Sequence, residues 1–324
     1  MIEPLLSGEV TKALSSGRPV VAMESTIFSN LGLPSPANHE ALRRCLAAVR
    51  DGGAVPAVTA VLDGVARVGL EPDEHLRILG SARKVAERDL PVAVAQRWEF
   101  GATTVSASVA LAASAGVLVF ATGGIGGVHR GADLTGDVSA DLDAIAHHAV
   151  VTVSAGAKAF LDLARTLEYL ETAGVPVLGW QHDDFPAFYT RSSGLPVPHR
   201  VESGAEVASI LANRTRARTG ILVGVPIPVA AELDPDELNR VIALALADCG
   251  SAGIVGAAVT PFVLGRIGQA TDGRSVPANL ALAENNARVA AEIAVAIAGQ
   301  SLVRVRSTRS RKAIRFSSVA RSRP

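Results

Sequence analysis

The sequence predicts an α/β fold, a single three-layer α/β/α domain with a mostly parallel central sheet. Short apolar runs alternate along the chain with longer segments of helical period, which is the pattern of strands joined by crossover helices. Hydrophobic residues make up 48% of the chain, but aromatic residues only 4%. A core filled in this way by Ala, Val, Leu and Gly is typical of helices packed tightly on both faces of a parallel sheet.

The first half of the chain begins with a helix that ends at Gly17 and a buried strand, VVAM, that stops at Glu24. A loop rich in Gly and Pro leads to an amphipathic helix with a Gly-Gly stop, a common helix terminator. Two β-runs joined by Asp63-Gly64 then predict a hairpin, because Asp-Gly favours the turn between antiparallel strands. Helices are expected at 4–17, 39–53, 72–82 and 101–116, and strands at 18–26 and within 54–70.

The second half repeats the alternation of strand and helix. The apolar runs GVLVFATGG, AVVTVSAG, VPVLGW and ILVGVPIP are predicted strands, and a Gly-rich loop follows the first of them. No internal repeat or linker interrupts the pattern, so residues 1–300 are predicted to form one domain. Helices are expected at 138–148, 158–174, 203–213, 235–250 and 277–299.

Residues 301–324 form a basic tail. They contain seven Arg, one Lys and no acidic residue, whereas the rest of the chain has 23 basic and 31 acidic residues. Such a tail could bind nucleic acid or anionic lipid, but it contains no folded recognition module. We expect it to be a disordered, solvated extension, and we do not expect a membrane or a nucleic acid among the partners.

The cysteine content and the start of the chain bear on the compartment. Cys45 and Cys249 are the two cysteines, and no CxxC motif is present, so neither a disulfide framework nor a structural zinc site is indicated. The start, MIEPLLSGEV, lacks the basic and apolar regions of a signal peptide. The uncharged stretch 105–127 is long enough for a membrane span, but its Ser, Thr and Gly content fits a buried helix, turn and strand better. We expect a soluble, cytoplasmic protein.

Polar residues follow several strand ends, where an open α/β sheet binds its ligand. Glu24 comes directly after VVAM. It could be a general acid or base in a cleft, or a carboxylate at the start of a helix.

The second strand end is the Gly-rich segment FATGGIGGVHRGADLTGD. It does not match GxGxxG, because the sixth position from Gly124 is His129, and no GK[ST] follows. Its backbone N–H groups could still approach a phosphate, with Thr122, His129 and Arg130 nearby.

Three polar residues, Asp137, Ser139 and Asp141, alternate at the start of the next predicted helix. Asp137 or Ser139 could simply cap that helix. Beside a Gly-rich loop, these carboxylates and the hydroxyl also suit a hard divalent cation that retains several waters, Mg²⁺ or Mn²⁺.

The third strand end carries a lysine in apolar company, in TVSAGAKAFLDL. The chain has many arginines but only four lysines, Lys12, Lys84, Lys158 and Lys312. Unlike arginine, lysine can lose its proton and act as an amine nucleophile. Lys158, at the start of the helix predicted over 158–174, could therefore form a Schiff base with a sugar carbonyl. Alternatively, its ammonium reaches the surface or pairs with an acid.

Together these segments resemble the pseudouridine-5′-phosphate glycosidase family, also called indigoidine synthase A-like. The resemblance is carried in collinear order, from about residue 5 to 300, by AMESTI, RDLP, GATTV, FATGGIGGVHRGA, DVSADL, SAGAKAFLDLARTLEYLET, GVPVLGWQ, FPAFY and VPIP. Two positions depart from the family: Met23 stands where leucine is usual, and Val225 stands where the family has the asparagine of NPIP.

The resemblance implies reversible cleavage of the C–C glycosidic bond of pseudouridine 5′-phosphate to uracil and ribose 5-phosphate, by a homotrimer. It implies that Lys158 forms a covalent adduct at C1′ of the ring-opened ribose and that Glu24 donates a proton to the base. Asp137 would hold Mn²⁺, or Mg²⁺ or another divalent ion, largely through water. The substrate-binding residues that carry over are Lys84, Val105, His129, Ser139, Ala140, Asp141 and Asn279. The alternatives are a lyase for a related C-nucleotide or ribose phosphate and, in another class, nucleic-acid binding through the tail.

Overall fold

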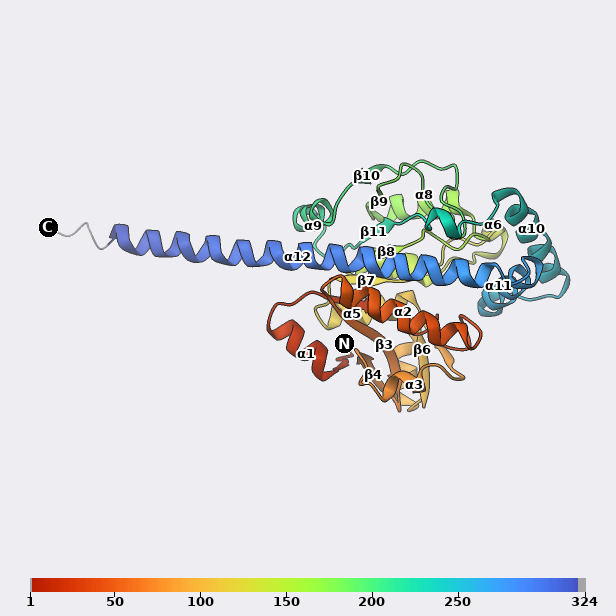
Figure 1. The fold of residues 1–324 in the computed structure, drawn as a ribbon, viewed down its shortest axis with the longest axis horizontal. Coiled ribbons are helices and arrows are strands. Elements are labelled where there is room, and N and C mark those ends of the chain that lie inside the picture. Colours follow the sequence, from red (N-terminus) through yellow and green to blue (C-terminus); the bar gives the residue numbers. More distant parts are fainter. Residues whose placement is uncertain (1, 320–324) are drawn as a thin grey trace.

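The sheet joins strands from almost the whole chain (Figure 1). The computed structural model describes residues 2–319, with the side chains of residues 2–256 and 258–300. Within these residues the sheet has 11 strands, in the order β1-β4-β3-β2-β7-β8-β11-β9-β10, with β6 paired to β3 and β5 to β6. Every pair from β3 to β10 along this order is parallel; β3 runs antiparallel to β4 and β6. The strands are β1 Leu5–Leu6, β2 Val20–Met23, β3 Val55–Leu62, β4 Val65–Val68, β5 Arg83–Val85, β6 Phe100–Thr103, β7 Val119–Ala121, β8 Val151–Ser154, β9 Val177–Trp180, β10 His199–Val201 and β11 Ile221–Gly224.

Helices cover both faces of the sheet, as predicted. The long helix α12 lies over β2, β7 and β8, and packs beside α2 and α9 (Figure 1). On the other face, α5 packs on β2, β3 and β7, and α7 packs beside α5 and α8. The helices are α1 Gly8–Ser15, α2 Ala37–Asp51, α3 Glu74–Arg77, α4 Leu90–Ala95, α5 Val105–Ser114, α6 Ala132–Thr135, α7 Ala140–His147, α8 Leu163–Ala173, α9 Gly204–Asn213, α10 Pro235–Ser251, α11 Val259–Ala270 and α12 Ser275–Val319, with 3₁₀ turns η1 Glu87–Asp89, η2 Val229–Ala231 and η3 Gly256–Ala258.

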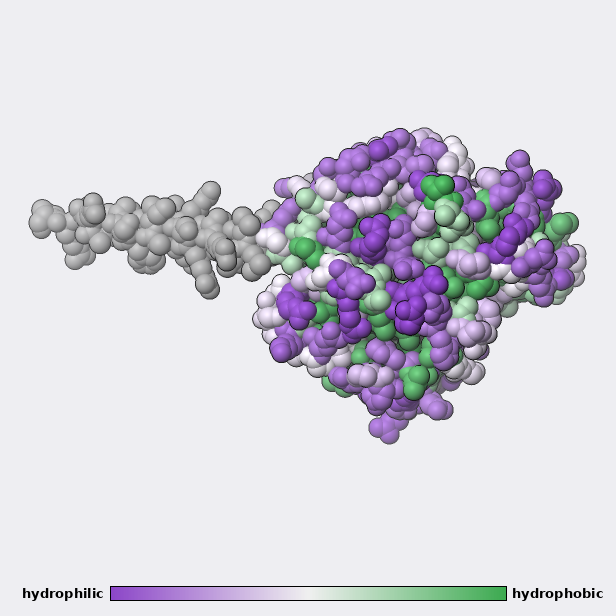
Figure 2. All heavy atoms as spheres, viewed as in Figure 1, coloured by the Kyte–Doolittle hydropathy of each residue, from purple (hydrophilic) through white to green (hydrophobic). Residues whose placement is uncertain are grey.

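The central strands are covered on both faces. All residues of β2, β3, β7, β8, β9 and β11 are buried, which explains why they read as continuous apolar runs rather than alternating ones. In contrast to these buried strands, the outer surface of α2 and its surroundings is largely hydrophilic (Figure 2). There Glu40 pairs with Arg43 and Arg44 along the helix.

The predicted hairpin is confirmed. Strands β3 and β4 pair antiparallel around Asp63 and Gly64, whose φ angles are 51° and 77°. Two successive left-handed residues form the turn whose twist matches that of the strands. A side chain at Gly64 would also lie 2.7 Å from the Cα of Arg97, so glycine is required there on two grounds.

Four predicted helices before α12 differ from the observed ones. The helix expected at 4–17 begins only at Gly8, because Leu5–Leu6 form strand β1. Only α3, Glu74–Arg77, forms within 72–82. The helix expected at 101–116 is instead strand β6 followed by α5, because Gly101 lets β6 pair closely: a Cβ there would lie 2.6 Å from Val85. The helix expected from Lys158 begins only at Leu163.

Helix α12 extends well beyond its expected end near residue 299. It continues to Val319, into the tail for which the sequence predicts disorder. The side chains of residues 301–319 lie outside the described ones. The division of the chain at residue 300 stays a prediction. No helix in the described part of the chain is both long and apolar enough to cross a membrane.

The strand order reverses between β2 and β7, and we call the region beyond the carboxyl ends of these two strands the crevice. After β2 the chain builds outward to β3 on one side, and after β7 it builds outward to β8 on the other. Such a reversal separates the connections beyond the carboxyl ends of the two strands, which is where open α/β sheets bind ligands. Glu24 follows β2 and Thr122 follows β7.

Candidate active site

Glu24 lies buried in the crevice, with 8% of its surface exposed. The Thr122 hydroxyl donates a hydrogen bond to its Oε1. Burial raises the pKa of the Glu24 carboxyl, while the Lys158 charge and the Thr122 hydrogen bond partly offset this effect. No helix starts at Glu24, since turns follow it and α2 begins only at residue 37. A buried carboxyl that holds its proton more tightly than usual is suited to general acid–base chemistry.

Lys158 lies in the turn between β8 and α8. Its Nζ donates a hydrogen bond to the carbonyl of Gly124 over 3.0 Å, and its backbone N–H donates to Ile125 over 3.1 Å. The expected position at a helix N-terminus is wrong, because Asp162 caps α8 by accepting from the N–H of Arg165. Lys158 forms no ion pair within 4.0 Å in the described part of the chain. It therefore neither caps the helix nor neutralises an acid by direct contact.

The backbone before Lys158 is held tightly. Gly156 has φ of +73°, and a Cβ at this position would lie 1.9 Å from the carbonyl oxygen of Pro186. The N–H of Ile125 donates to the Gly156 carbonyl over 3.1 Å. This close approach joins the lysine turn to the Gly-rich loop and fixes the direction in which Lys158 leaves the sheet.

Lys84 lies on β5, at the rim of the same group of charges. The residue is exposed, yet removal of water from its ammonium is the main cause that lowers the pKa of Lys84, and repulsion by Lys158 adds to it. Asp141 and Glu24 act in the opposite direction. The structure thus brings together four of the predicted residues, two amines and two carboxyls, from β5, α7 and the ends of β2 and β8.

Asp141 joins the starts of two helices to the Gly-rich loop. Its Oδ1 accepts from the N–H of Ser106 over 3.0 Å and its Oδ2 from that of Gly126 over 2.8 Å. Ser139 caps α7 by accepting from the N–H of Asp141 over 3.2 Å. Val105 and Ala140, the first residues of α5 and α7, are thereby close to the same loop. Helix N-termini of this kind attract phosphate groups.

The Gly-rich loop offers fewer free N–H groups than the sequence suggests. Its conformation requires glycine, since a Cβ at Gly126 would lie 2.2 Å from Ser139 Oγ. In its first part, residues 122–129, five backbone amides donate hydrogen bonds within the chain: those of Thr122, Ile125, Gly126, Val128 and His129. The two helix starts are therefore better placed to take a phosphate than the loop alone.

Asp137 and His129 face one another beside this loop, with 3.7 Å between His129 Nδ1 and Asp137 Oδ2. Burial lowers the pKa of His129, although the nearby negative charge of Asp137 acts to raise it. No cluster of three or more His, Cys, Asp or Glu side chains suited to a metal occurs in the described part of the chain. A single carboxylate, 37% exposed, does not fit a closed zinc-type cage, but it fits Mn²⁺ or Mg²⁺ that keeps most of its waters.

Helix α12 contributes two buried amides to the crevice. Asn279 is 8% exposed, and its Oδ1 lies near Gly123 without a hydrogen-bond partner. Asn286 donates to the carbonyls of Thr122 and Gly123. Sequence reasoning included Asn279 but missed Asn286, although their spacing of seven residues places both on one face of the helix, which was a signal that it could have used.

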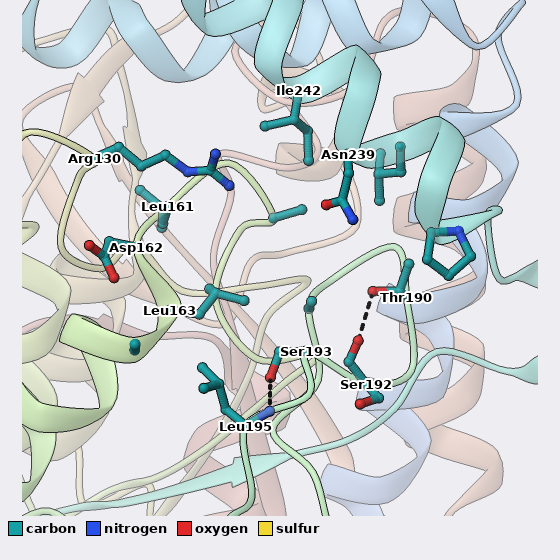
Figure 3. Close-up of a pocket in the computed structure, with 15 residues that line it drawn as sticks. Arg130, Leu161, Asp162, Leu163, Thr190, Ser192, Ser193, Leu195, Asn239 and Ile242 are labelled. Atoms are coloured by element: carbon teal, nitrogen blue, oxygen red, sulfur yellow. Dashed lines mark hydrogen bonds between the residues drawn. The ribbon is translucent and has the colours of Figure 1, made fainter.

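A separate cavity of about 400 Å³ opens next to the site. In Figure 3 the Arg130 guanidinium and the Asn239 side chain point into it from opposite walls. Its lining contains none of the ten predicted site residues, although Arg130 and Ala159 are the sequence neighbours of His129 and Lys158. The candidate active site is the crevice between β2 and β7, and not this cavity.

Comparison with known proteins places the chain in a family. Residues 9–296 match the family described as indigoidine synthase A like protein. The chain belongs to the indigoidine synthase A-like family. Two curated relatives are named pseudouridine-5′-phosphate glycosidase: one from Methylobacterium nodulans, 51% identical over 306 residues, 92% of this chain and 90% of the relative, and one from Caldanaerobacter subterraneus subsp. tengcongensis, 49% identical over 295 residues, 90% and 95%.

Solved structures of this family have the same fold. The prealnumycin C-glycosynthase AlnA, solved in complex with ribulose 5-phosphate, superposes with a TM-score of 0.85 at 36% identity, over 93% of this chain and 98% of its own. An indigoidine synthase A-like protein from Thermotoga maritima gives a TM-score of 0.82 at 36% identity, over 92% and 97%. The family resemblance and the α/β fold read from the sequence are confirmed.

Proposed function

We propose that this enzyme reversibly cleaves the C–C glycosidic bond of pseudouridine 5′-phosphate, giving uracil and ribose 5-phosphate, within pseudouridine catabolism. The observation that carries the proposal is the meeting of Glu24 and Lys158 in one crevice: a buried acid beside an amine that forms no direct ion pair with any described residue. The name shared by the curated relatives supports the same reaction.

The bond to be broken explains why an amine is needed. A C–C glycosidic bond has no heteroatom leaving group, so the two carboxylates of ordinary glycosidases do not suffice. As the C1′–O4′ bond breaks, its electrons stay with O4′, the uncharged amine of Lys158 adds to C1′, and one of the amine protons passes to O4′. Glu24 then gives its proton to C5 of the base, and the electrons of the C1′–C5 bond restore the double bond of uracil.

The lysine nitrogen stabilises the electron-poor carbon that remains. Its lone pair converts C1′ to an iminium as uracil leaves, and water hydrolyses this Schiff base to ribose 5-phosphate and free Lys158. One water is consumed overall, and the proton lost by Glu24 is regained in the hydrolysis. The raised pKa of Glu24 favours a carboxyl that still carries its proton when the adduct forms.

The phosphate has a suitable place at the starts of α5 and α7. Backbone N–H groups at Val105 and Ala140, the Ser139 hydroxyl and the Lys84 ammonium provide donors and positive charge there. Binding the phosphate far from the reacting bond would orient C1′ toward Lys158.

Asp137 is the residue that would hold a divalent ion, Mn²⁺ or Mg²⁺. When bound, such an ion neutralises phosphate or hydroxyl charge next to the sugar. Asp137 would hold the ion through its carboxylate, directly or through water, and His129 lies 3.7 Å from that carboxylate, next to the ion site.

A homotrimer is the assembly that we propose, as in the family. Large apolar side chains are exposed around the end of the molecule that carries α6, α10 and α11, and such patches mark interaction surfaces. They are Leu134, Val229, Leu244 and Val255, each at least 67% exposed. Light scattering of the purified chain tests this assembly.

A second candidate is a C-glycosynthase or lyase for a related C-nucleotide. The likeness to AlnA favours it, since that C-glycosynthase was solved in complex with ribulose 5-phosphate, a pentose phosphate. Measuring the release of free base from a panel of C-nucleotide monophosphates separates the two.

Nucleic-acid binding through residues 301–324 is tested by deleting these residues. If the tail binds nucleic acid, the deletion abolishes RNA or DNA retention and leaves catalysis unchanged.

The main test measures uracil release from pseudouridine 5′-phosphate with and without Mn²⁺. Borohydride treatment with ribose 5-phosphate, followed by peptide mass mapping, should place a stable adduct on Lys158. An adduct on another residue would refute the role of this lysine, and absence of uracil release would refute the reaction.

A further inference from the structure

Asn286 is a fully buried amide in an apolar part of α12. It is 0% exposed, and the neighbours Ala287, Val289 and Ala290 are also fully or almost fully buried. Its Nδ2 donates to the carbonyl oxygen of Thr122 over 2.8 Å and to that of Gly123 over 3.1 Å. Burying an amide costs free energy unless it is hydrogen-bonded, and here one amide group serves two carbonyls at the end of β7.

Thr122 is thereby held from three sides. Its N–H donates to the carbonyl of Val153 in β8 over 3.0 Å, its carbonyl accepts from Asn286, and its hydroxyl donates to Glu24. The contacts on its N–H and its carbonyl fix the backbone from which the Thr122 side chain projects toward Glu24. Of these three contacts, the one from Asn286 is made by a helix that packs on the sheet.

We propose that Asn286 is a positioning residue of the reaction: by holding the end of β7, it keeps the Thr122 hydroxyl directed at Glu24 and fixes the orientation in which this acid meets the base. The proposal rests on the proposed function in one respect, that Glu24 is the acid. It needs no contact between Asn286 and the substrate.

The charges that face Glu24 remain in place when Asn286 is changed. They are Lys158 from the turn after β8, Lys84 from β5 and Asp141 from α7, with Thr122 as the neutral donor. Of these, the Thr122 hydrogen bond is the contribution that depends on Asn286. It stabilises the carboxylate, so its loss should raise the pKa of Glu24 further and move the high-pH limb of the activity profile to higher pH.

The test compares Asn286→Leu, which keeps the branched shape of the side chain and removes the donors, with Asn285→Leu. Asn285 is the matched control, because it lies on the same helix and also contacts a backbone carbonyl, that of Pro226 over 3.4 Å, away from Glu24. We expect Asn286→Leu to lower kcat/KM about tenfold to a hundredfold and to move the high-pH limb upward, and Asn285→Leu to leave both unchanged. Asn286→Ala, which adds no bulk to the helix, replaces the leucine variant if that variant does not fold.

The double variant with Thr122→Val distinguishes positioning from a purely structural role. If Asn286 acts through the Thr122 hydroxyl, Asn286→Leu shifts the pH limb no further once that hydroxyl is absent. A drop in melting temperature with an unmoved pH limb, or equal shifts in the presence and absence of the hydroxyl, would overturn the proposal.

A readout without substrate separates this inference from the proposed function. The side-chain carboxyl of Glu24 is titrated by ¹³C NMR, with its signal assigned from Glu24→Gln. An upward shift in Asn286→Leu with no uracil release by the parent enzyme would leave the positioning role intact and refute the reaction. An unchanged titration refutes the positioning role even if uracil is released.

Discussion

The amine of Lys158 donates its hydrogen bond to the neutral carbonyl of Gly124, over 3.0 Å, rather than to a carboxylate. The acceptor belongs to the loop that follows β7, so the lysine turn after β8 and the Gly-rich loop hold the amine between them. A neutral partner leaves no salt bridge to be broken when the nitrogen attacks. The three-residue turn between Ser154 and Lys158 thus directs the amine toward the crevice that contains Glu24.

Replacing Lys158 with alanine should reduce uracil release by at least about a thousandfold, because no other described amine occupies its position. Lys158→Arg should be equally inactive, since a guanidinium keeps the charge but cannot form the adduct. Both variants should retain the circular dichroism spectrum of the parent. Lys12→Ala, on the exposed face of α1, is the control and should remain active. Full activity in either Lys158 variant would exclude a covalent lysine.

Glu24→Gln should lower kcat about a hundredfold to ten-thousandfold, because the amide keeps the shape of the side chain but has no proton to give. The variant should also change the pH dependence of stability. Since the folded pKa of Glu24 lies above its ordinary value of 4.5, the native state binds more protons than the unfolded state above pH 4.5. Its contribution therefore makes the free energy of unfolding fall as pH rises through the folded pKa. Urea denaturation at several pH values should show this fall in the parent and a weaker one in Glu24→Gln.

The sequence revealed the parts of this site that lie at strand ends. Glu24, Thr122 and Lys158 could be found because polar residues interrupt apolar runs at points where an open sheet binds ligands. The Asp63-Gly64 turn could be found because its conformation is local. The contact from Asn286 to Thr122 joins residues 164 positions apart, and depends on the way α12 crosses the sheet. No local pattern encodes that crossing.

The start of α8 also depends on contacts that the local pattern does not encode: the sequence predicts a helix from Lys158, and the observed helix begins at Leu163. The segment after Lys158 has helical period, but the Asp162 side chain and the packing of the lysine turn on the Gly-rich loop delay the helix to Leu163. The apolar period predicts which residues are buried, and a single capping contact decides where the helix begins.

Gly156→Ala should be strongly destabilising. A Cβ there would lie 1.9 Å from the Pro186 carbonyl oxygen, and alanine would also have to adopt φ of +73°. We therefore expect the free energy of unfolding to fall by about 3 kcal/mol or more. Gly116→Ala is the control: its φ is +77°, but nothing lies within 4 Å of the added atom, and we expect a loss of about 1–2 kcal/mol. Equal losses by chemical denaturation would show that the approach to Pro186 is not tight.

Asp141→Asn should weaken both stability and substrate binding. The amide keeps one acceptor but places a donor against the N–H of Ser106 or Gly126, and the charge–dipole contact is lost, at a cost of about 1–3 kcal/mol. The starts of α5 and α7 would then be held less firmly, so KM for the phosphorylated substrate should rise. Asp143→Asn, two residues further along the same helix and exposed, should change neither quantity. An unchanged KM in Asp141→Asn would separate this carboxylate from the phosphate site.

Asp137→Asn should reduce the activation by Mn²⁺ rather than the activity that remains without metal. Asp137 is the one carboxylate beside His129 and the Gly-rich loop that is both half-exposed and free of an arginine partner in the described part of the chain. Loss of its charge should therefore raise the Mn²⁺ concentration needed for half-maximal uracil release by about tenfold or more. Asp133→Asn, in the same loop but paired with Arg165, is the matched control and should titrate as the parent does. The same Mn²⁺ titration, followed by electron paramagnetic resonance of the free ion, reports binding without turnover. Identical titration curves for Asp137→Asn and the parent enzyme would place the metal elsewhere.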